Sequence, residues 1–462
     1  MNALTSGQRK LVYGLGIIVL MGCVILLGQP SDGKLGSGGL VSDLREEYSL
    51  GEATLGNVDP ASSTMNLVLL GFRGIAASIL WSDAEHYRMT KNWSQLQQSA
   101  DSITLLQPHF KKVWEYQAWN LGFNVSSECD AVEDRYYWVK QGAKYLQRGT
   151  RRNTQFPELY FECGRFFGQK IGRADEKEQF RKFFVHDPDE SRWKGKGDGD
   201  INPENIDNYK VARVWYLAAN DRLENGKLEQ HKMDLPLFLA YPYHSLMDFA
   251  SAREDDGHFD AEARNAWADA YQQWTNEFGR KVFPVAGDGT LINLEGSAED
   301  LKQMAKSDGQ PFQDKLHWQD RYRSTTNYNY WKDRCRAEQE EDMLNARRDF
   351  YRGKIEFKEE FELEKSRILI ESGAQSLQAV IDKFGKNDAG KSILLYSDPE
   401  LAEDAIKALL ILERVRDGLP EGDYPLKELW TDPQFASKKE EIREKFNRWA
   451  GASYPARPAA TP

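Results

Sequence analysis

An apolar run near the N-terminus most restricts how this chain can fold, because it needs either a membrane or a protein core around it. The run covers residues 11–27, LVYGLGIIVLMGCVILL, and follows Arg9 and Lys10. As a helix, these 17 residues would extend about 26 Å, at the short end of what spans a hydrocarbon layer about 30 Å thick. The sequence therefore predicts a transmembrane helix at residues 11–28, with residues 1–10 as its cytoplasmic tail.

Two alternatives for this run are a cleaved signal peptide and a buried core helix. A signal peptide has a shorter apolar region that ends in small residues, whereas this run ends in Leu26 and Leu27. Met21, Gly22 and Cys23 resemble a lipid-attachment motif, but the chain stays apolar after the cysteine. Basic residues before the run favour a cytoplasmic N-terminus. We therefore expect an uncleaved single-pass anchor with the bulk of the chain on the far side, the periplasm in a bacterium.

A second apolar segment, residues 66–81, is interrupted by Arg73 and has polar flanks. A short stretch with an internal charge is more typical of a buried core helix than of a membrane span. We therefore expect one anchor, joined to the remaining chain by a flexible tether at residues 29–64.

The composition is that of a globular protein with an acidic surface. The chain is 40% hydrophobic and 29% charged, with a formal net charge of −11. Lysine and arginine are interleaved with aspartate and glutamate, so no basic face for nucleic-acid phosphates is indicated. Nucleic acid is therefore not expected as a partner.

The four cysteines show no C-x-x-C spacing. Cys23 lies in the predicted anchor, so at most one disulfide can form among Cys129, Cys163 and Cys335. Cys129 with Cys163 is the pair we would expect first, but we favour three unpaired buried thiols.

Amphipathic segments predict helices over most of the chain, and the short connections between them favour antiparallel helix pairs. Residues 283–296 could form a β-hairpin, and Ser297 is predicted to cap a further helix. The predicted helical segments are 66–91, 93–106, 109–126, 131–149, 157–172, 175–185, 208–224, 242–254, 259–281, 325–384, 398–417 and 433–449. The corresponding regions are helical repeats at 65–190, a loop at 191–207, a helical continuation at 208–324, a helical block at 325–450 and a disordered tail at 451–462.

A 34-residue repeat supports a more specific fold. Counting from Pro157, a tetratricopeptide-like pattern places Tyr160, Gly164, Phe167 and Phe180 at its aromatic and small positions, and Pro188 follows as its terminating proline. Glu176 and Phe183 depart from the pattern in this unit. Of two earlier units, one ends at Pro108 and the other carries an insertion around residues 126–131. Three consecutive units are enough to form a stacked core. The fold class expected is all-α, a tetratricopeptide-like solenoid of helix pairs on a single N-terminal transmembrane helix.

Five segments together resemble a family of membrane-anchored tetratricopeptide-like proteins of planctomycete-type bacteria, some labelled iron-responsive-element proteins. These segments are FRGIAASILWSDAEHYRM, WSQLQQSADSITLLQPHF, VWEYQAWNLGFNV, RYYWVKQGAKYLQRGTRRN and GRFFGQKIGRADEKEQF, within residues 65–184. The resemblance implies an architecture and a membrane location, without a catalytic residue. The label would imply RNA or iron, but neither a basic surface nor a cluster of iron ligands is present in the sequence.

None of the residue patterns in the sequence matches a known catalytic or metal-binding motif, so we expect no catalytic, cofactor-binding or metal-binding residue. Asp83, Glu85 and His86 are close in sequence. Glu85 and His86 point about 100° apart on a helix, so they cannot both bind one metal ion without ligands from elsewhere. Residues 198–202 begin like a calcium loop, but Pro203 stands at the required glycine. A polar surface loop is expected there. Residues 186–190 are interpreted as a helix stop with exposed acids.

Two further patterns are interpreted as packing. Glycines 164, 168 and 172 form a ridge that could mediate helix dimerisation in a membrane, but charged neighbours favour close packing in a soluble repeat. Residues 337–365 resemble a coiled coil until Glu364 breaks the heptad. Gly353 and Gly373 suggest turns, so further helix pairs are predicted.

The function expected from these features is that of a scaffold or adaptor, not an enzyme. It would bind a protein or peptide in a groove of the repeats, using exposed aromatics such as Trp93, Trp114 and Tyr136. A membrane-tethered metal-binding protein or enzyme built around Glu85 and His86 is the alternative. An RNA- or iron-related regulator, as the family label suggests, is the least favoured.

Overall fold

The structure is a computed structural model that describes residues 6–28, 44, 47, 73–226, 233–285, 289–387, 389–416, 418 and 424–451. Nearly all of the predicted tether, the start of the second apolar segment and the tail after residue 451 lie outside these residues. The predicted all-α class is confirmed, since 77% of the described chain is helical and its strands are limited to one two-stranded hairpin. The chain divides into two compact units, Met1–Lys232 and Met233–Pro462, at a position not among the boundaries expected from sequence.

The N-terminal apolar run is helical. It lies within α1 (Ser6–Gly28), a helix of 23 residues. Large apolar side chains of α1 are half or more exposed, among them Leu11 at 69% and Ile18 at 70%. Within the part of the chain that the structure describes, no helix combines the length and apolarity that crossing a membrane demands.

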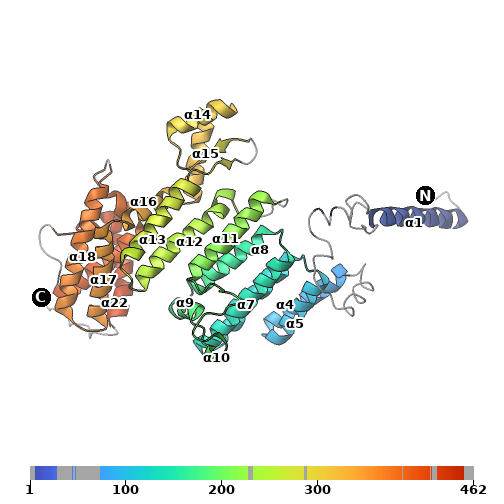
Figure 1. The fold of residues 1–462 in the computed structure, drawn as a ribbon, viewed down its shortest axis with the longest axis horizontal. Helices are drawn as coiled ribbons and strands as arrows, with labels where there is room; N and C mark the ends of the chain where they lie inside the picture. The colour runs from blue at the N-terminus through green and yellow to red at the C-terminus, as the bar shows by residue number, and fades with distance from the viewer. Residues whose placement is uncertain are drawn as a thin grey trace. The chain divides into compact units, whose positions relative to one another are not determined.

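Unit 1 consists of helices in which sequence neighbours pack together. Contacts join α4 to α5, α5 to α6, α6 and η2 to α7, α7 to α8, and α8 and η3 to α11 (Figure 1). The elements are α4 (Arg73–Met89), α5 (Trp93–Leu106), α6 (Lys111–Trp119), η2 (Asn120–Val125), α7 (Val132–Arg152), α8 (Pro157–Arg165), η3 (Phe166–Ile171), α9 (Lys177–Val185), α10 (Glu190–Trp193) and α11 (Asn208–Asn225). Both η2 and η3 are π-helical turns, which the sequence analysis did not predict.

Local chemistry explains where these helices begin and end. Pro157 begins α8 at a position where its missing N–H costs nothing. The side chain of Asp207 accepts from the backbone N–H of Tyr209 and caps α11. The first turn of α7 carries Glu133 and Asp134, and its last turn is basic, which complements the helix dipole.

The glycine ridge of α8 and η3 packs against α11, as the soluble-repeat interpretation predicted. A Cβ atom on Gly164 would lie 2.6 Å from Cδ1 of Tyr216, and one on Gly172 would lie 2.6 Å from Cζ of Tyr209. Side chains at these positions would push the helices apart. The ridge is therefore a helix-packing surface inside unit 1.

Unit 2 is also helical, with one small hairpin in the stretch where the sequence allows one. Phe283 pairs with Ile292 in an antiparallel register. Ser297 caps α14 in a capping box with Asp300. The elements are α12 (Leu235–Asp255), α13 (Ala261–Gln272), η4 (Gln273–Phe278), β1 (Phe283–Pro284), β2 (Leu291–Ile292), α14 (Ala298–Asp308), α15 (Phe312–Thr325), α16 (Tyr328–Glu338), α17 (Glu341–Lys358), α18 (Leu363–Phe384), α19 (Ile393–Ser397), α20 (Pro399–Arg416), α21 (Glu428–Thr431), η5 (Pro433–Phe435) and α22 (Ala436–Gly451).

Helices α17 and α18 form a closely packed pair, and α20 packs on both of them. Gly353 and Gly373 lie inside this pair, so the prediction of turns at these positions was wrong. A Cβ on Gly353 would lie 2.7 Å from Cδ1 of Ile370, and one on Gly373 would lie 2.8 Å from Cδ1 of Phe350. The two glycines allow the close approach of the helices, because any side chain there would separate them.

Candidate functional site

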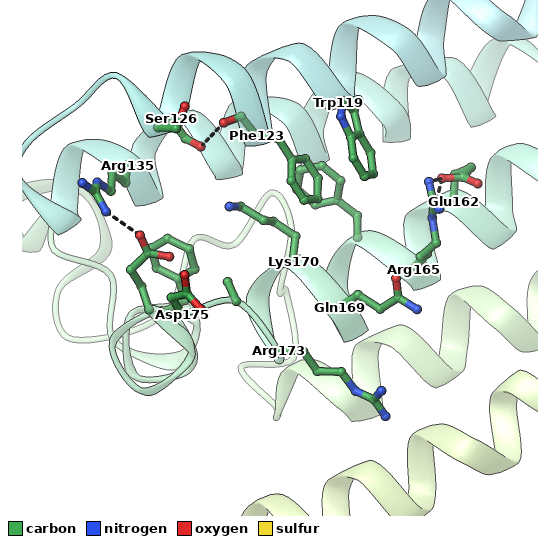
Figure 2. A pocket seen from close by; sticks show the side chains of 15 residues that line it. Trp119, Phe123, Ser126, Arg135, Glu162, Arg165, Gln169, Lys170, Arg173 and Asp175 are labelled. Atoms are coloured by element: carbon green, nitrogen blue, oxygen red, sulfur yellow. Dashed lines mark hydrogen bonds and ion pairs between the residues drawn. The ribbon is translucent and has the colours of Figure 1, made fainter. Parts of the chain in front are cut away.

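A groove of about 770 Å³ lies within unit 1, where α6, η2, α7, α8, η3 and α9 meet (Figure 2). This volume is in the range of pockets that bind small molecules. We call it the unit 1 groove. Its lining residues are Trp119, Phe123, Ser126, Ser127, Arg135, Glu162, Arg165, Phe166, Gln169, Lys170, Arg173, Ala174, Asp175, Glu176 and Phe180.

Stacked aromatic rings form one wall of the groove. The ring centroids of Trp119 and Phe123 are 3.8 Å apart with an interplanar angle of 11°. Phe166 meets Phe123 edge-on at 6.1 Å. The guanidinium of Arg165 lies 5.3 Å from the ring of Trp119. Although it is stacked, Trp119 remains 45% exposed, so part of this aromatic side chain is open to solvent and to a ligand.

The two π-helical turns place these rings. Trp119 is the last residue of α6 and Phe123 lies in η2, while Phe166 and Lys170 both lie in η3. A side chain on Gly122 would overlap the ring of Phe166, so glycine is required for η2 to approach η3. π-Helical turns are rare and occur frequently at functional sites. Here both of them line the groove.

Two of the basic residues in the groove are engaged by acids of the same chain. Arg135 binds Glu176 at 2.5 Å, and Arg165 binds Glu162 at 2.6 Å. Burial raises the pKa of the Glu162 carboxyl, and Arg165 opposes that shift. Burial also acts to raise the pKa of Glu176, but the hydrogen bond from Arg135, a backbone hydrogen bond and the charges of Lys170 and Arg135 together outweigh it, so this pKa is lowered. These pairs hold the walls of the groove together.

Lys170 differs from those two arginines. Its ammonium forms no hydrogen bond or ion pair with any residue that the structure describes. It lies 4.6 Å from the ring centroid of Phe123 and 5.7 Å from that of Phe180. Burial lowers the pKa of Lys170, while the charges of Glu176 and Asp175 oppose the shift. In Figure 2 its side chain extends into the middle of the groove.

The predicted aromatic contact residues lie elsewhere. Trp114 is 3% exposed and Tyr136 is fully buried, so the expectation that both are exposed was wrong. Trp114 donates from Nε1 to the carbonyl of Pro108, 2.9 Å away, and packs on Tyr145. Trp93 begins α5, is partly buried and does not line the groove. These rings fill spaces between helices, as aromatics of a helical core do.

Glu85 and His86 do not form a metal site in the structure. The carboxylate of Glu85 pairs with Arg88 at 2.5 Å and accepts a hydrogen bond from the hydroxyl of Tyr116 at 2.9 Å. Those hydrogen bonds from Arg88 and Tyr116 lower the pKa of Glu85. Among the residues with described positions, no group of three or more His, Cys, Asp or Glu side chains could hold a metal ion.

The loop around residues 187–202 is more buried than the sequence suggested. Asp187 and Asp198 are each 1% exposed, which corrects the interpretation of both as surface acids. Lys140 of α7 binds Asp187 at 2.5 Å, and Lys144 binds Asp198 at 2.7 Å and Asp200 at 2.8 Å. The acids that resembled a calcium loop therefore attach this loop to α7.

All four cysteines are free thiols. Cys163 and Cys335 are buried, and burial raises the pKa of both, so neither is a ready nucleophile at neutral pH. Cys129 is partly buried and its pKa is also raised, first by burial and then by Asp134. The preference for unpaired thiols over a Cys129–Cys163 disulfide agrees with the structure.

Comparison with known proteins assigns no family to this chain. No protein-family model, no curated protein and no solved structure matches it. The functional argument therefore rests on the groove itself.

The groove was not predicted as a site, although part of it was visible in the sequence. Trp119 and Phe123 are four residues apart, which places them on one face of a helix. Lys170 is a single charge between Phe166, Phe167 and Ile171, in a segment interpreted only as helix packing. What brings these residues together is the crossing of two π-helical turns, which sequence periodicity does not reveal.

Proposed function

We propose that this protein is a membrane-anchored, helical-repeat scaffold that binds a peptide segment of a partner protein in the unit 1 groove. The observation that carries the proposal is the stack of Trp119 on Phe123, in which Trp119 is 45% exposed, beside Lys170, which has no ion pair among the described residues. Exposed aromatic anchors in a concave pocket are typical of interaction hot spots. Two of the three acids in the groove, Glu162 and Glu176, bind arginines, so an arrangement for binding is better supported than one for catalysis.

The helix-pair order of unit 1 supports a tetratricopeptide-like organisation as part of this proposal. Helices α4 with α5, α6 and η2 with α7, and η3 with α9 are in contact, in chain order. Phe167 and Phe180 are fully buried, Tyr160 is 7% exposed and Gly164 is buried, which suits the aromatic and small positions of such a repeat. The resemblance to membrane-anchored tetratricopeptide-like proteins agrees with this organisation.

The membrane location rests on the sequence of residues 11–27 with the two basic residues before it. The exposed apolar side chains of α1 add support, because a surface of this kind is stable only when something apolar covers it. Protease treatment of intact spheroplasts expressing the full chain tests the location. We expect digestion of both units outside the cytoplasm, and protection of both would contradict it.

The binding function can be tested with a displayed library of random 12-residue peptides, selected on the purified full-length chain. We expect selected peptides that lose at least tenfold in affinity when Trp119→Ala removes the exposed ring of the stack. Tyr137→Ala is the matched control, since Tyr137 is 50% exposed on α7 and does not line the groove. Absence of any selected peptide, or equal loss for both variants, would contradict the proposal.

A further inference from the structure

The charge of the groove restricts what it can bind. Its lining contains four basic residues, Arg135, Arg165, Lys170 and Arg173, and three acidic residues, Glu162, Asp175 and Glu176. Two of the acids are in the ion pairs with Arg135 and Arg165 described above. The lining is thus basic in a chain whose net charge is −11. A ligand that complements it carries negative charge.

Lys170 is the residue with which a negatively charged ligand would pair. Removing an ammonium from water is costly unless a counter-ion and hydrogen bonds replace the lost hydration. Phe123 and Phe180 supply part of this stabilisation through their ring faces, but neither accepts a conventional hydrogen bond. Glu176 is close enough to affect the lysine electrostatically, yet its carboxylate is bound by Arg135. None of the residues with described positions accepts a hydrogen bond from the ammonium, so its N–H donors can reach a ligand.

We propose that the unit 1 groove selects peptides with an acidic side chain, whose carboxylate pairs with Nζ of Lys170 while a neighbouring apolar side chain packs on the Trp119–Phe123 stack. The inference rests on the proposed peptide-binding function and specifies its ligand. Such a pair would be a charge-assisted hydrogen bond in a partly dehydrated groove, where it is stronger than in water.

A carboxylate fits the groove better than a phosphate. Phosphate recognition commonly uses the paired N–H donors of arginine as well as lysine, because the ligand carries close to two negative charges. Arg135 already donates to Glu176 and to the carbonyl of Cys129, and Arg165 donates to Glu162. Arg173, the third arginine of the lining, also has an interaction partner of its own. One lysine with a single charge matches one carboxylate.

The test uses the same peptide library selected on the full-length chain, followed by affinity measurements with the best peptide. We expect aspartate or glutamate to be enriched at one fixed position of the selected peptides. Changing that acid to its amide should weaken binding to the unmodified protein at least tenfold. The same change should alter binding to the Lys170→Gln variant less than twofold, because the partner of the carboxylate is then missing.

Two variants control for charge and folding. Lys170→Arg keeps the charge and should retain the preference for the acid. Lys182→Gln removes an exposed lysine of the neighbouring α9 that does not line the groove, and should leave the preference unchanged. Circular dichroism checks that each variant is folded.

The possible outcomes separate this inference from the proposed function. If peptides bind through Trp119 but show no acid enrichment, the lysine inference is wrong and the peptide-binding function stands. The inference is also overturned if the acid-to-amide change has the same effect in the Lys170→Gln variant as in the unmodified protein, or if a phosphoserine at the fixed position binds more tightly than the acid. If no peptide binds at all, both proposals fail.

Discussion

The groove of unit 1 and the core of unit 2 both hold cations partly or wholly away from water, but they differ in whether every cation has an acidic partner. In unit 2, Arg347 binds Glu338 at 2.6 Å and Asp404 at 2.9 Å, and Arg334 binds Glu400. In the groove, Lys170 lies between two aromatic rings without an ion pair among the described residues. The arginines of unit 2 are held by acids of the same unit, whereas Lys170 is the group that the proposed ligand would pair with.

Two acids near these arginines, Glu338 and Glu254, are buried. Glu338 is 1% exposed, and Glu254 accepts a hydrogen bond from Nε1 of Trp267 at 2.8 Å. Burial and the nearby charge of Glu338 raise the pKa of Glu254 to about 8, while Arg347 opposes the shift. Such a network is stable only while every member keeps its partner.

The largest expected effect comes from breaking this network. Arg347→Met removes the cation beside Glu338 and leaves a buried carboxylate without it. The expected loss is about 3 to 5 kcal/mol in the free energy of unfolding, as for other broken buried ion pairs. Urea unfolding of the full-length chain measures this. Lys445→Met, which breaks the exposed pair with Glu441 on α22, is the control and should change little. If both variants lose little free energy of unfolding, the buried ion pairs of unit 2 are not needed for its stability.

A smaller loss is expected where the two π-helical turns of the groove meet. Gly122→Ala places a methyl group into the ring of Phe166, and overpacking of this kind costs about 1 to 3 kcal/mol. Gly168→Ala is the matched control in η3, because its Cβ would lie 3.5 Å from Cβ of Ala212, an ordinary contact. Both variants can be compared by thermal unfolding. If Gly122→Ala is as stable as Gly168→Ala, the close crossing of η2 and η3 is not required.

The pH dependence of the free energy of unfolding tests whether the pKa of the buried Glu254 is raised. A carboxyl whose pKa is raised on folding stabilises the folded state below its unfolded pKa, and that contribution is lost as the pH rises through the folded value. With Glu254 at about 8, stability should fall by about 2 kcal/mol between pH 6 and pH 8. Urea unfolding at both pH values measures the change, and Glu254→Gln should reduce it. Equal pH dependence in both proteins would show that another group is responsible.

The smallest expected effect is on the groove lysine. Lys170→Met replaces the ammonium by an apolar group of similar length, and no ion pair is broken. The free energy of unfolding should change by less than about 0.5 kcal/mol, in contrast to Arg347→Met. The same urea experiment provides the measurement. A loss as large as that of Arg347→Met would mean that Lys170 stabilises the fold. The proposal that Lys170 binds a ligand would then lose its support.

The sequence was a good guide to helices and a poor guide to sites. The predicted segment at 93–106 coincides with α5, and Ser297 caps α14 as expected. Trp114 and Tyr136 were chosen as surface anchors because aromatic residues favour both interfaces and cores, and residue type alone does not separate the two. Asp187 and Asp198 were expected at the surface, yet Lys140 and Lys144 neutralise them in the interior.

The sequence by itself determined the all-α class, because helical periodicity and capping are local properties of the chain. It also determined that the glycine ridge would pack closely, since charged neighbours exclude a lipid environment. Only the tertiary structure decided which aromatics are exposed and which charges are paired. Burial and pairing depend on contacts between residues distant in the sequence, such as Gly122 with Phe166. The groove with Lys170 at its centre exists because two π-helical turns cross there.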